Sequence, residues 1–160
     1  MRQAGVTQPV SLPAVALPPA TLAQLGDAAE GLLVAATFRP AGTGGEANEE
    51  FERDMGSFEP AARPNVFSRQ GWLAGRTLAR VIESDRGPDD ATRVIDAETV
   101  LARMGSLDAL PMGAMTPPFT TTANLPPPYS RLFTRQVLYG RVAGGAVQLL
   151  GEQWHPVSVD

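Results

Sequence analysis

The chain has 160 residues, a formal net charge of −4, 43% hydrophobic residues and no cysteine. This length and composition fit one globular domain with its own core. The lack of cysteine excludes disulfides, thiolate nucleophiles and cysteine-based zinc sites, and one histidine, His155, is too few for a histidine metal site. We therefore expect no metal and no cofactor.

The positive charges are all arginines, 13 in number, and they are scattered along the chain. Because no basic stripe with interleaved aromatic residues forms, the sequence argues against nucleic-acid binding. No pairing of a nucleophile with a base is visible, so we expect no enzyme activity. The first twenty residues are interrupted by prolines and do not resemble an export signal, and no apolar run is long enough to span a membrane.

The first half of the chain alternates between predicted strands and helices. A short strand at 10–12 is followed by a helix at 18–25, in which Pro19 suits the first turn and Gly26 ends the helix. A second strand, 29–38, contains a continuous apolar run. Such a run is typical of a strand buried on both faces in a parallel sheet covered by helices.

Three helices are predicted next. The first, at 48–55, has Asn48 as its expected N-cap. The second and strongest, at 70–84, has apolar residues at helical spacing that predict its buried face, namely Trp72, Gly75, Ala79 and Ile82. In the same helix, ion pairs are expected among Arg76, Arg80 and Glu83. The third, at 97–105, is expected to be capped by Asp96 and stopped by Gly105.

The last third begins with an irregular stretch, 111–129, which either wraps another part of the protein or lies loose. A β-hairpin is predicted over 131–154, with Gly144-Gly145 as its turn and Trp154 closing the second strand. This order of elements indicates an α/β protein. Since a doubly wound sheet normally has more parallel strands, the chain reads as the rear part of a larger protein.

Five stretches together resemble the C-terminal portion of the leucine/isoleucine/valine-binding family, the type I periplasmic binding proteins that serve ABC importers. They are "AGVTQPV", "LGDAAEGLLVAATF", "NEEFERDM", "VFSRQGWLAGRTLARVIE" and "AETVLARM". The resemblance runs from Arg2 to Met104 and more loosely to Trp154. It covers most of this chain but only the rear part of the family's length.

The resemblance implies an incomplete type I periplasmic-binding-protein-like fold, in which two lobes enclose a ligand. Residues 1–63 would belong to the second lobe, and residues 64–160 would belong to the first lobe and a C-terminal hairpin. The implied function is capture of an amino acid or a related small molecule by hinge closure, with an ABC permease complex as partner and a periplasmic location. Two alternatives stay open: a ligand-sensing domain of a receptor or regulator, and a non-binding remnant.

Two residues match ligand-binding positions of that family. Glu30, in the "AEG" element, would meet the ammonium group of a bound amino acid, and a carboxylate at a strand end suits a charge-assisted hydrogen bond. Phe67 precedes the main helix and would pack on an aliphatic ligand side chain. The alternatives are a solvated or arginine-paired role for Glu30 and plain core packing for Phe67.

Overall fold

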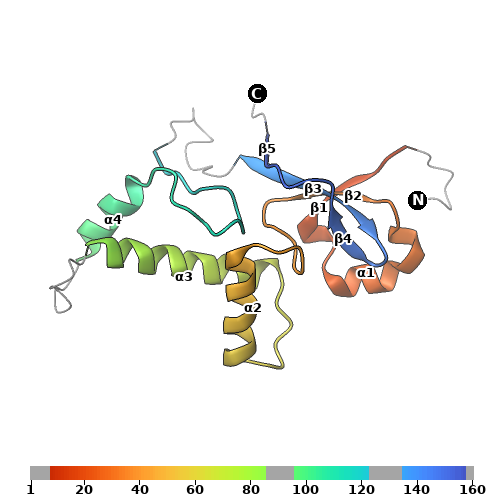
Figure 1. Cartoon of the computed structure of the whole chain (residues 1–160), viewed down its shortest axis with the longest axis horizontal. Helices are drawn as coiled ribbons and strands as arrows, with labels where there is room; N and C mark the ends of the chain where they lie inside the picture. Colours follow the sequence, from red (N-terminus) through yellow and green to blue (C-terminus); the bar gives the residue numbers. More distant parts are fainter. Residues whose placement is uncertain (1–7, 86–95, 123–134, 158–160) are drawn as a thin grey trace.

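The structure, a computed structural model, describes residues 8–85, 96–122 and 135–157 (Figure 1). Within these residues the strands are β1 (Ser11–Pro13), β2 (Leu33–Ala36), β3 (Gln136–Ala143), β4 (Ala146–Leu149) and β5 (His155–Pro156). The α-helices are α1 (Pro19–Leu25), α2 (Glu46–Phe58), α3 (Val66–Asp85) and α4 (Ala97–Gly105), and two 3-10 helices are η2 (Ala14–Ala16) and η3 (Gly26–Ala29). The predicted α/β class is confirmed.

The strands form one mixed sheet in the order β1-β2-β3-β4, with β5 paired to the start of β3. Strand β1 is parallel to β2, whereas β3 is antiparallel to it. Burial alternates along β2: Val34 and Ala36 are buried, while Leu33 and Ala35 are only half-buried. The expectation that this strand is buried on both faces was therefore wrong, because in the described chain only one face carries a packed core.

That core joins the sheet to the segment around α1. Its buried members are Leu17, Leu22, Ala29, Val34 and Val142. Pro19 begins α1 and Gly26, with φ of 49°, ends it, as the sequence predicted. Leu22 of this short helix packs in the core and so holds the helix against the sheet.

The hairpin of β3 and β4 is confirmed, and its turn is Gly144-Gly145, with φ of 60° and 76°. Positive φ at both central residues is the requirement of a tight hairpin turn, which glycine meets without steric cost. The second strand ends at Leu149, so the prediction that Trp154 closes it was wrong. The chain instead turns back, and His155 of β5 pairs with Val137 of β3.

A second core is made by helices and one loop. Its buried members are Ala47, Phe51, Leu73, Met112 and Met115. The two methionines belong to the predicted irregular stretch, which is drawn together by a bridge between Leu110 and Phe119. The described part of that stretch therefore wraps α2 and α3, and the rest of it, 123–129, lies outside the described residues.

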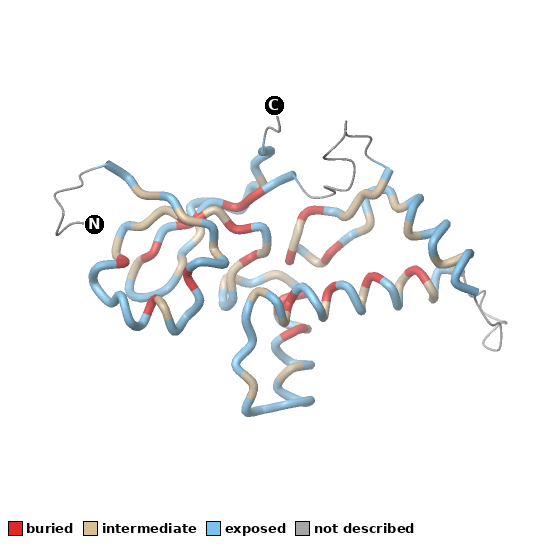
Figure 2. Tube along the Cα trace, turned by 180° about the vertical axis from the view of Figure 1, so that it is seen from behind, coloured by how far each residue is buried: buried red, intermediate tan, exposed pale blue. Residues whose placement is uncertain are grey.

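The buried face of α3 overlaps only in part with the predicted one, because Trp72 and Ile82 are half-buried and Trp72 packs against the second core, but the most buried positions are others. The buried positions recur along it at four-residue spacing (Figure 2): Arg69, Leu73, Thr77 and Val81. Gly75 and Ala79, placed in the core by the sequence, are exposed. The polar residues of the true face bond locally or to neighbours, as when Thr77 Oγ1 donates to the Leu73 carbonyl over 2.8 Å. Because the prediction considered only apolar residues, it misplaced part of the buried face of α3.

The ion pairs of α3 also differ from expectation. Arg76 pairs with Glu50 of α2 at 2.6 Å, and Arg80 donates to the Pro111 carbonyl. Both contacts tie α3 to neighbouring segments. The prediction of pairing within the helix was therefore wrong.

Two predicted helix caps had different outcomes. Asp96 caps α4 as predicted, accepting from the Thr99 amide over 2.8 Å, and the helix ends at Gly105. Asn48 does not cap α2, which begins two residues earlier after Gly45. Gly45 has φ of 96°, a conformation that favours glycine, so the helix starts where the backbone allows and Asn48 falls inside it, buried.

The two cores divide the described chain into two units that lie side by side in Figure 1. We call residues 8–37 with 135–157 the sheet unit, and residues 38–85 with 96–122 the helical unit. The division into lobes at residue 63 stays a prediction; α2, before that residue, packs on α3, after it. Among the described helices, none has the length and apolar character that crossing a membrane requires.

Candidate binding site

A cavity of about 400 Å³ lies where the two units meet. We call it the inter-unit cavity. The sheet unit contributes residues of the η2–α1 segment and of the β3–β4 hairpin, and the helical unit contributes the chain after β2 and the start of α3. Its lining residues are Ala14, Val15, Leu17, Pro18, Pro19, Leu22, Phe38, Arg39, Pro40, Ala41, Pro64, Asn65, Val66, Phe67, Arg69, Gly145, Ala146 and Val147.

The floor of the cavity on the sheet side is fixed by residues that also belong to the first core. Leu17 and Leu22 are buried, and Val147 packs against them from the hairpin. Such shared packing means that the apolar wall is held by folding rather than by a ligand. A concave, mostly apolar surface with a few polar groups is the usual form of a small-molecule site.

Arg39 crosses between the units at the edge of this cavity and is only 6% exposed. Its Nε donates to the Ala114 carbonyl and its Nη1 to the Thr43 carbonyl, both over 3.1 Å. Its Nη2 donates to Oε2 of Glu152, beyond β4, over 2.5 Å. The hydrogen bond and charge of Arg39 lower the pKa of Glu152 below its ordinary value. Every nitrogen of this guanidinium is thus engaged.

Arg69 of α3 also lines the cavity, and it is 7% exposed. Its Nη1 donates to Oδ1 of Asn48 over 2.7 Å and to the Arg39 carbonyl over 3.2 Å. The nearest carboxylate is that of Glu52, 3.7 Å from Nη2. Burial lowers the pKa of Arg69, and the charge of Glu52 opposes that effect.

Asn48 explains why the chain after β2 keeps its shape. Its Nδ2 lies 3.4, 3.2 and 3.0 Å from the carbonyl oxygens of Arg39, Pro40 and Gly44, respectively. The amide therefore bonds the strand-to-helix connection and Arg69 at the same time. Because the Asn48 side chain bonds through both its oxygen and its nitrogen, it holds the connection and Arg69 in one local arrangement.

Phe67 lines the inter-unit cavity, and its expected contact with a ligand stays a prediction. Its side chain is 67% exposed, so the alternative of core packing does not hold. The position is set by Asn65, whose Oδ1 accepts from the Phe67 amide over 2.9 Å and from the Ser68 amide over 3.1 Å. This is a helix cap, and it presents an exposed aromatic ring beside the apolar wall.

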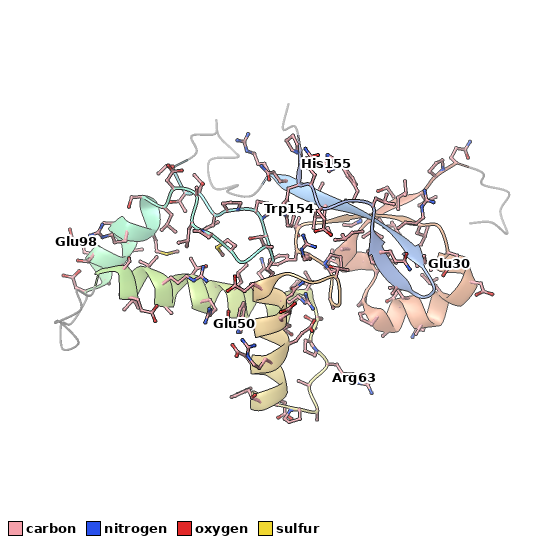
Figure 3. All side chains as sticks on the ribbon, viewed as in Figure 1. Glu30, Glu50, Arg63, Glu98, Trp154 and His155 are labelled. Atoms are coloured by element: carbon pink, nitrogen blue, oxygen red, sulfur yellow. The ribbon has the colours of Figure 1, made fainter. Side chains whose placement is uncertain are left out.

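Glu30 lies beside the hairpin (Figure 3), half-buried after η3. Its Oε1 accepts a hydrogen bond from the Gly145 amide over 3.2 Å. Glu30 does not line the inter-unit cavity, but Gly145 does. The structure therefore brings Phe67 to the cavity wall and connects Glu30 to it through one turn residue.

Sequence reasoning missed Arg39, Asn48 and Arg69. A usable signal existed for Arg69, which stands four residues before Leu73 on the buried face of α3. Arg39 stands three residues after the end of β2, in the connection beyond a strand end, where α/β sheets place ligand contacts. Neither residue is apolar, so neither entered the predicted core, and neither was among the positions that the family resemblance supplied.

A second hollow, of about 500 Å³, lies over the sheet. Its walls come from the sheet unit alone: Ser11, Leu33, Tyr139, Gly140, Leu150, Gly151 and His155. The ring centroids of Tyr139 and His155 lie 5.3 Å apart, and His155 is exposed. Within the described ranges, no three acidic or histidine side chains gather as a metal site would require.

Comparisons with known proteins identify a family through a sequence model and a fold through solved structures. A family model described as "Periplasmic binding protein" matches residues 1–131. No curated protein sequence matches this chain.

Three solved structures share its fold. A possible leucine/isoleucine/valine-binding protein from Rhodopirellula baltica is 18% identical, with a TM-score of 0.69, over 94% of this chain and 38% of its own. A leucine-binding protein from Thermotoga maritima is 19% identical, with a TM-score of 0.60, and the match covers 94% of this chain and 38% of that protein. A branched-chain amino acid ABC transporter protein from Thermus thermophilus, with bound valine, is 17% identical, with a TM-score of 0.61. The match covers 99% of this chain and 41% of that protein. The chain thus spans about two fifths of their length.

Proposed function

The chain belongs to the periplasmic binding protein family, and we propose that it takes part in capturing a small solute in the inter-unit cavity. The ligand class that we propose is an amino acid, branched-chain ones first, or a related small carboxylate or amide. The observation that carries the proposal is that the cavity walls come from two units with separate cores.

Hinge closure is the proposed mode of capture. Two packed units joined by a short connection rotate more readily than one continuous core deforms, so a ligand between them favours the closed arrangement. The connection from β2 to α2 is one such link. We propose that the sheet unit and the helical unit are parts of the two lobes, which moves the lobe boundary from residue 63 to residue 37.

Two contacts within this proposal come from the family resemblance. Phe67 packs on the aliphatic part of the ligand, and its exposed ring at the cavity supports this role. Glu30 meets the ligand's ammonium group. Its carboxylate accepts from the Gly145 amide at the cavity wall, and a carboxylate, with about four acceptor positions, can accept from several donors at once.

The partner that we propose is an ABC permease complex, and the proposed location is the periplasm. Both follow from family membership and from the ABC transporter protein with the same fold. This chain spans 38% to 41% of the length of the solved structures it resembles, and we propose the permease contact for the two-lobe arrangement that they have in full.

Thermal unfolding of the 160-residue chain with leucine, isoleucine or valine at millimolar concentration tests this function. A ligand at one hundred times its Kd stabilises the folded state by about 2.7 kcal/mol, which raises the midpoint temperature of unfolding measurably. Ala146→Trp fills the cavity and should abolish the shift, whereas Ala102→Trp, on exposed α4, should preserve it. No shift with any amino acid or small carboxylate would contradict the proposal.

A further inference from the structure

The charged side chains that line the inter-unit cavity are of one sign. Among its described lining residues, two are arginines, Arg39 and Arg69, and none is acidic. Glu30 stands behind the wall, where it accepts from the Gly145 amide. The carboxylates that face the two arginines are those of Glu152, whose side chain is 75% exposed, and Glu52, whose side chain is 49% exposed. Solvent screens these last two carboxylates more than it screens the buried guanidinium groups. The wall therefore favours an anionic group.

Arg39 and Arg69 differ in how their donors are used. All three nitrogens of Arg39 donate to protein acceptors. In Arg69, only Nη1 donates a hydrogen bond within the described chain. Its Nε and Nη2 donate no hydrogen bond there, although the side chain is more than nine-tenths buried. Buried donors without acceptors are costly, so a ligand oxygen at Arg69 removes a penalty.

The neutral partners of Arg69 strengthen this asymmetry. Its short hydrogen bonds go to an amide oxygen, Asn48 Oδ1, and to a backbone carbonyl. Neither cancels the positive charge, and the Glu52 carboxylate lies at 3.7 Å. A guanidinium in such a setting matches a carboxylate with two parallel donors, which is the geometry in which arginine binds anions best.

We propose that Arg69 binds the carboxylate of the ligand in the inter-unit cavity, so that the site selects small carboxylates with an apolar body. This inference rests on the proposed function, since it names the residue that binds the carboxylate end of the same ligand. The apolar body lies against Val66, Phe67 and Val147. A ligand lacking its carboxylate is then discriminated against more strongly than one lacking its ammonium group.

Two analogues of leucine separate these ends. The compound 4-methylpentanoate keeps the carboxylate and the branched tail, while 3-methylbutylamine keeps the ammonium group and the same tail. Titration of the full chain by calorimetry, with leucine, 4-methylpentanoate and 3-methylbutylamine in turn, gives three Kd values. We expect the amine to bind at least about tenfold more weakly than the acid, as loss of a charge-assisted hydrogen bond implies.

The second part of the test repeats these titrations with Arg69→Gln and, as a matched control, with Arg76→Gln. Arg76 lies two turns further along α3, pairs with Glu50 and does not line this cavity. We expect Arg69→Gln to lower the ratio of acid to amine affinity at least about tenfold and Arg76→Gln to leave it unchanged. A purely structural role for Arg69 would weaken both analogues together and keep the ratio.

The outcomes separate the two proposals. If the amine binds as tightly as the acid, or if leucine binds and the acid does not, the role of Arg69 is wrong while solute capture stands. If none of the three compounds binds, the proposed function itself is contradicted. Should Arg69→Gln fail to fold, the comparison of analogues on the unaltered chain still decides.

Discussion

Glu30 and Gly145 are 115 positions apart in the chain, yet the Gly145 amide donates a hydrogen bond to the Glu30 carboxylate over 3.2 Å. Gly145 is half of the β3–β4 turn and lines the inter-unit cavity. The carboxylate that precedes strand β2 thus meets the backbone of a hairpin formed at the other end of the chain. This hydrogen bond ties the segment before β2 to a turn residue that lines the cavity.

Two substitutions of Glu30 separate its contact with the turn from its proposed contact with a ligand. Glu30→Gln keeps an acceptor oxygen, whereas Glu30→Ala removes it and should lower the free energy of unfolding by about 1 kcal/mol more. If Glu30 meets the ammonium group, Glu30→Gln should also weaken leucine binding about tenfold and leave 4-methylpentanoate unaffected. Urea denaturation and calorimetry measure the two effects. Equal weakening of both ligands would refute the ammonium contact.

Asn48 should be among the most sensitive polar positions. Asn48→Ala leaves the Arg69 guanidinium and the carbonyls of Pro40 and Gly44 without their partner, so we expect a loss of about 2–4 kcal/mol in the free energy of unfolding. Asn65→Ala, which removes an exposed helix cap, should cost about 1 kcal/mol. Equal losses in urea denaturation would mean that the buried network contributes no more than a cap.

The loop that follows α4 should behave as core. Met115 is fully buried in the second core, and Met104, near the end of α4, is half-buried. Met115→Ala should lower the free energy of unfolding by about 2–5 kcal/mol and Met104→Ala by clearly less, because truncation of a buried side chain leaves a cavity. Urea denaturation measures both. Similar small losses would show that the loop does not close the core.

The Arg39–Glu152 pair predicts a pH dependence. Because the pKa of Glu152 is lowered in the folded chain, its contribution to stability is present above the unfolded value of about 4.3 and is lost as pH falls through the lower folded value. Glu152→Gln should therefore be less stable than the unaltered chain at pH 7, with the gap closing as the medium becomes acidic. The urea midpoint, followed from pH 7 downward, reports this gap. Glu59→Gln, at an exposed position, is the matched control for the loss of one surface carboxylate.

Elements governed by local chemistry were predictable from the sequence. The glycine pair at 144–145 can adopt the positive φ of a tight turn, and Asp96 offers an oxygen to the first turn of α4, so both positions were correct. The family resemblance was equally accessible, since it rests on whole segments, and the family model confirms it. These features need no knowledge of tertiary contacts.

What the sequence did not reveal depends on distant partners. Asn48 reads as a helix cap until Arg69 and the connection after β2 are placed around it. The true face of α3 contains Arg69 and Thr77, which a search for apolar spacing rejects. The partner of Glu30 lies on a hairpin more than one hundred residues away. In each case, the place of the residue depends on hydrogen bonds to partners that are distant in the sequence.

The central claim is that ligand enters the inter-unit cavity, and methyl NMR of the full chain with valine and leucine methyl labelling tests it most directly. Titration with leucine should shift the methyl signals of Val15, Val66 and Val147, which line that cavity, and leave Val100 on α4 unmoved. Shifts confined to Leu33 and Leu150, in the hollow over the sheet, or no shifts at all, would contradict the claim.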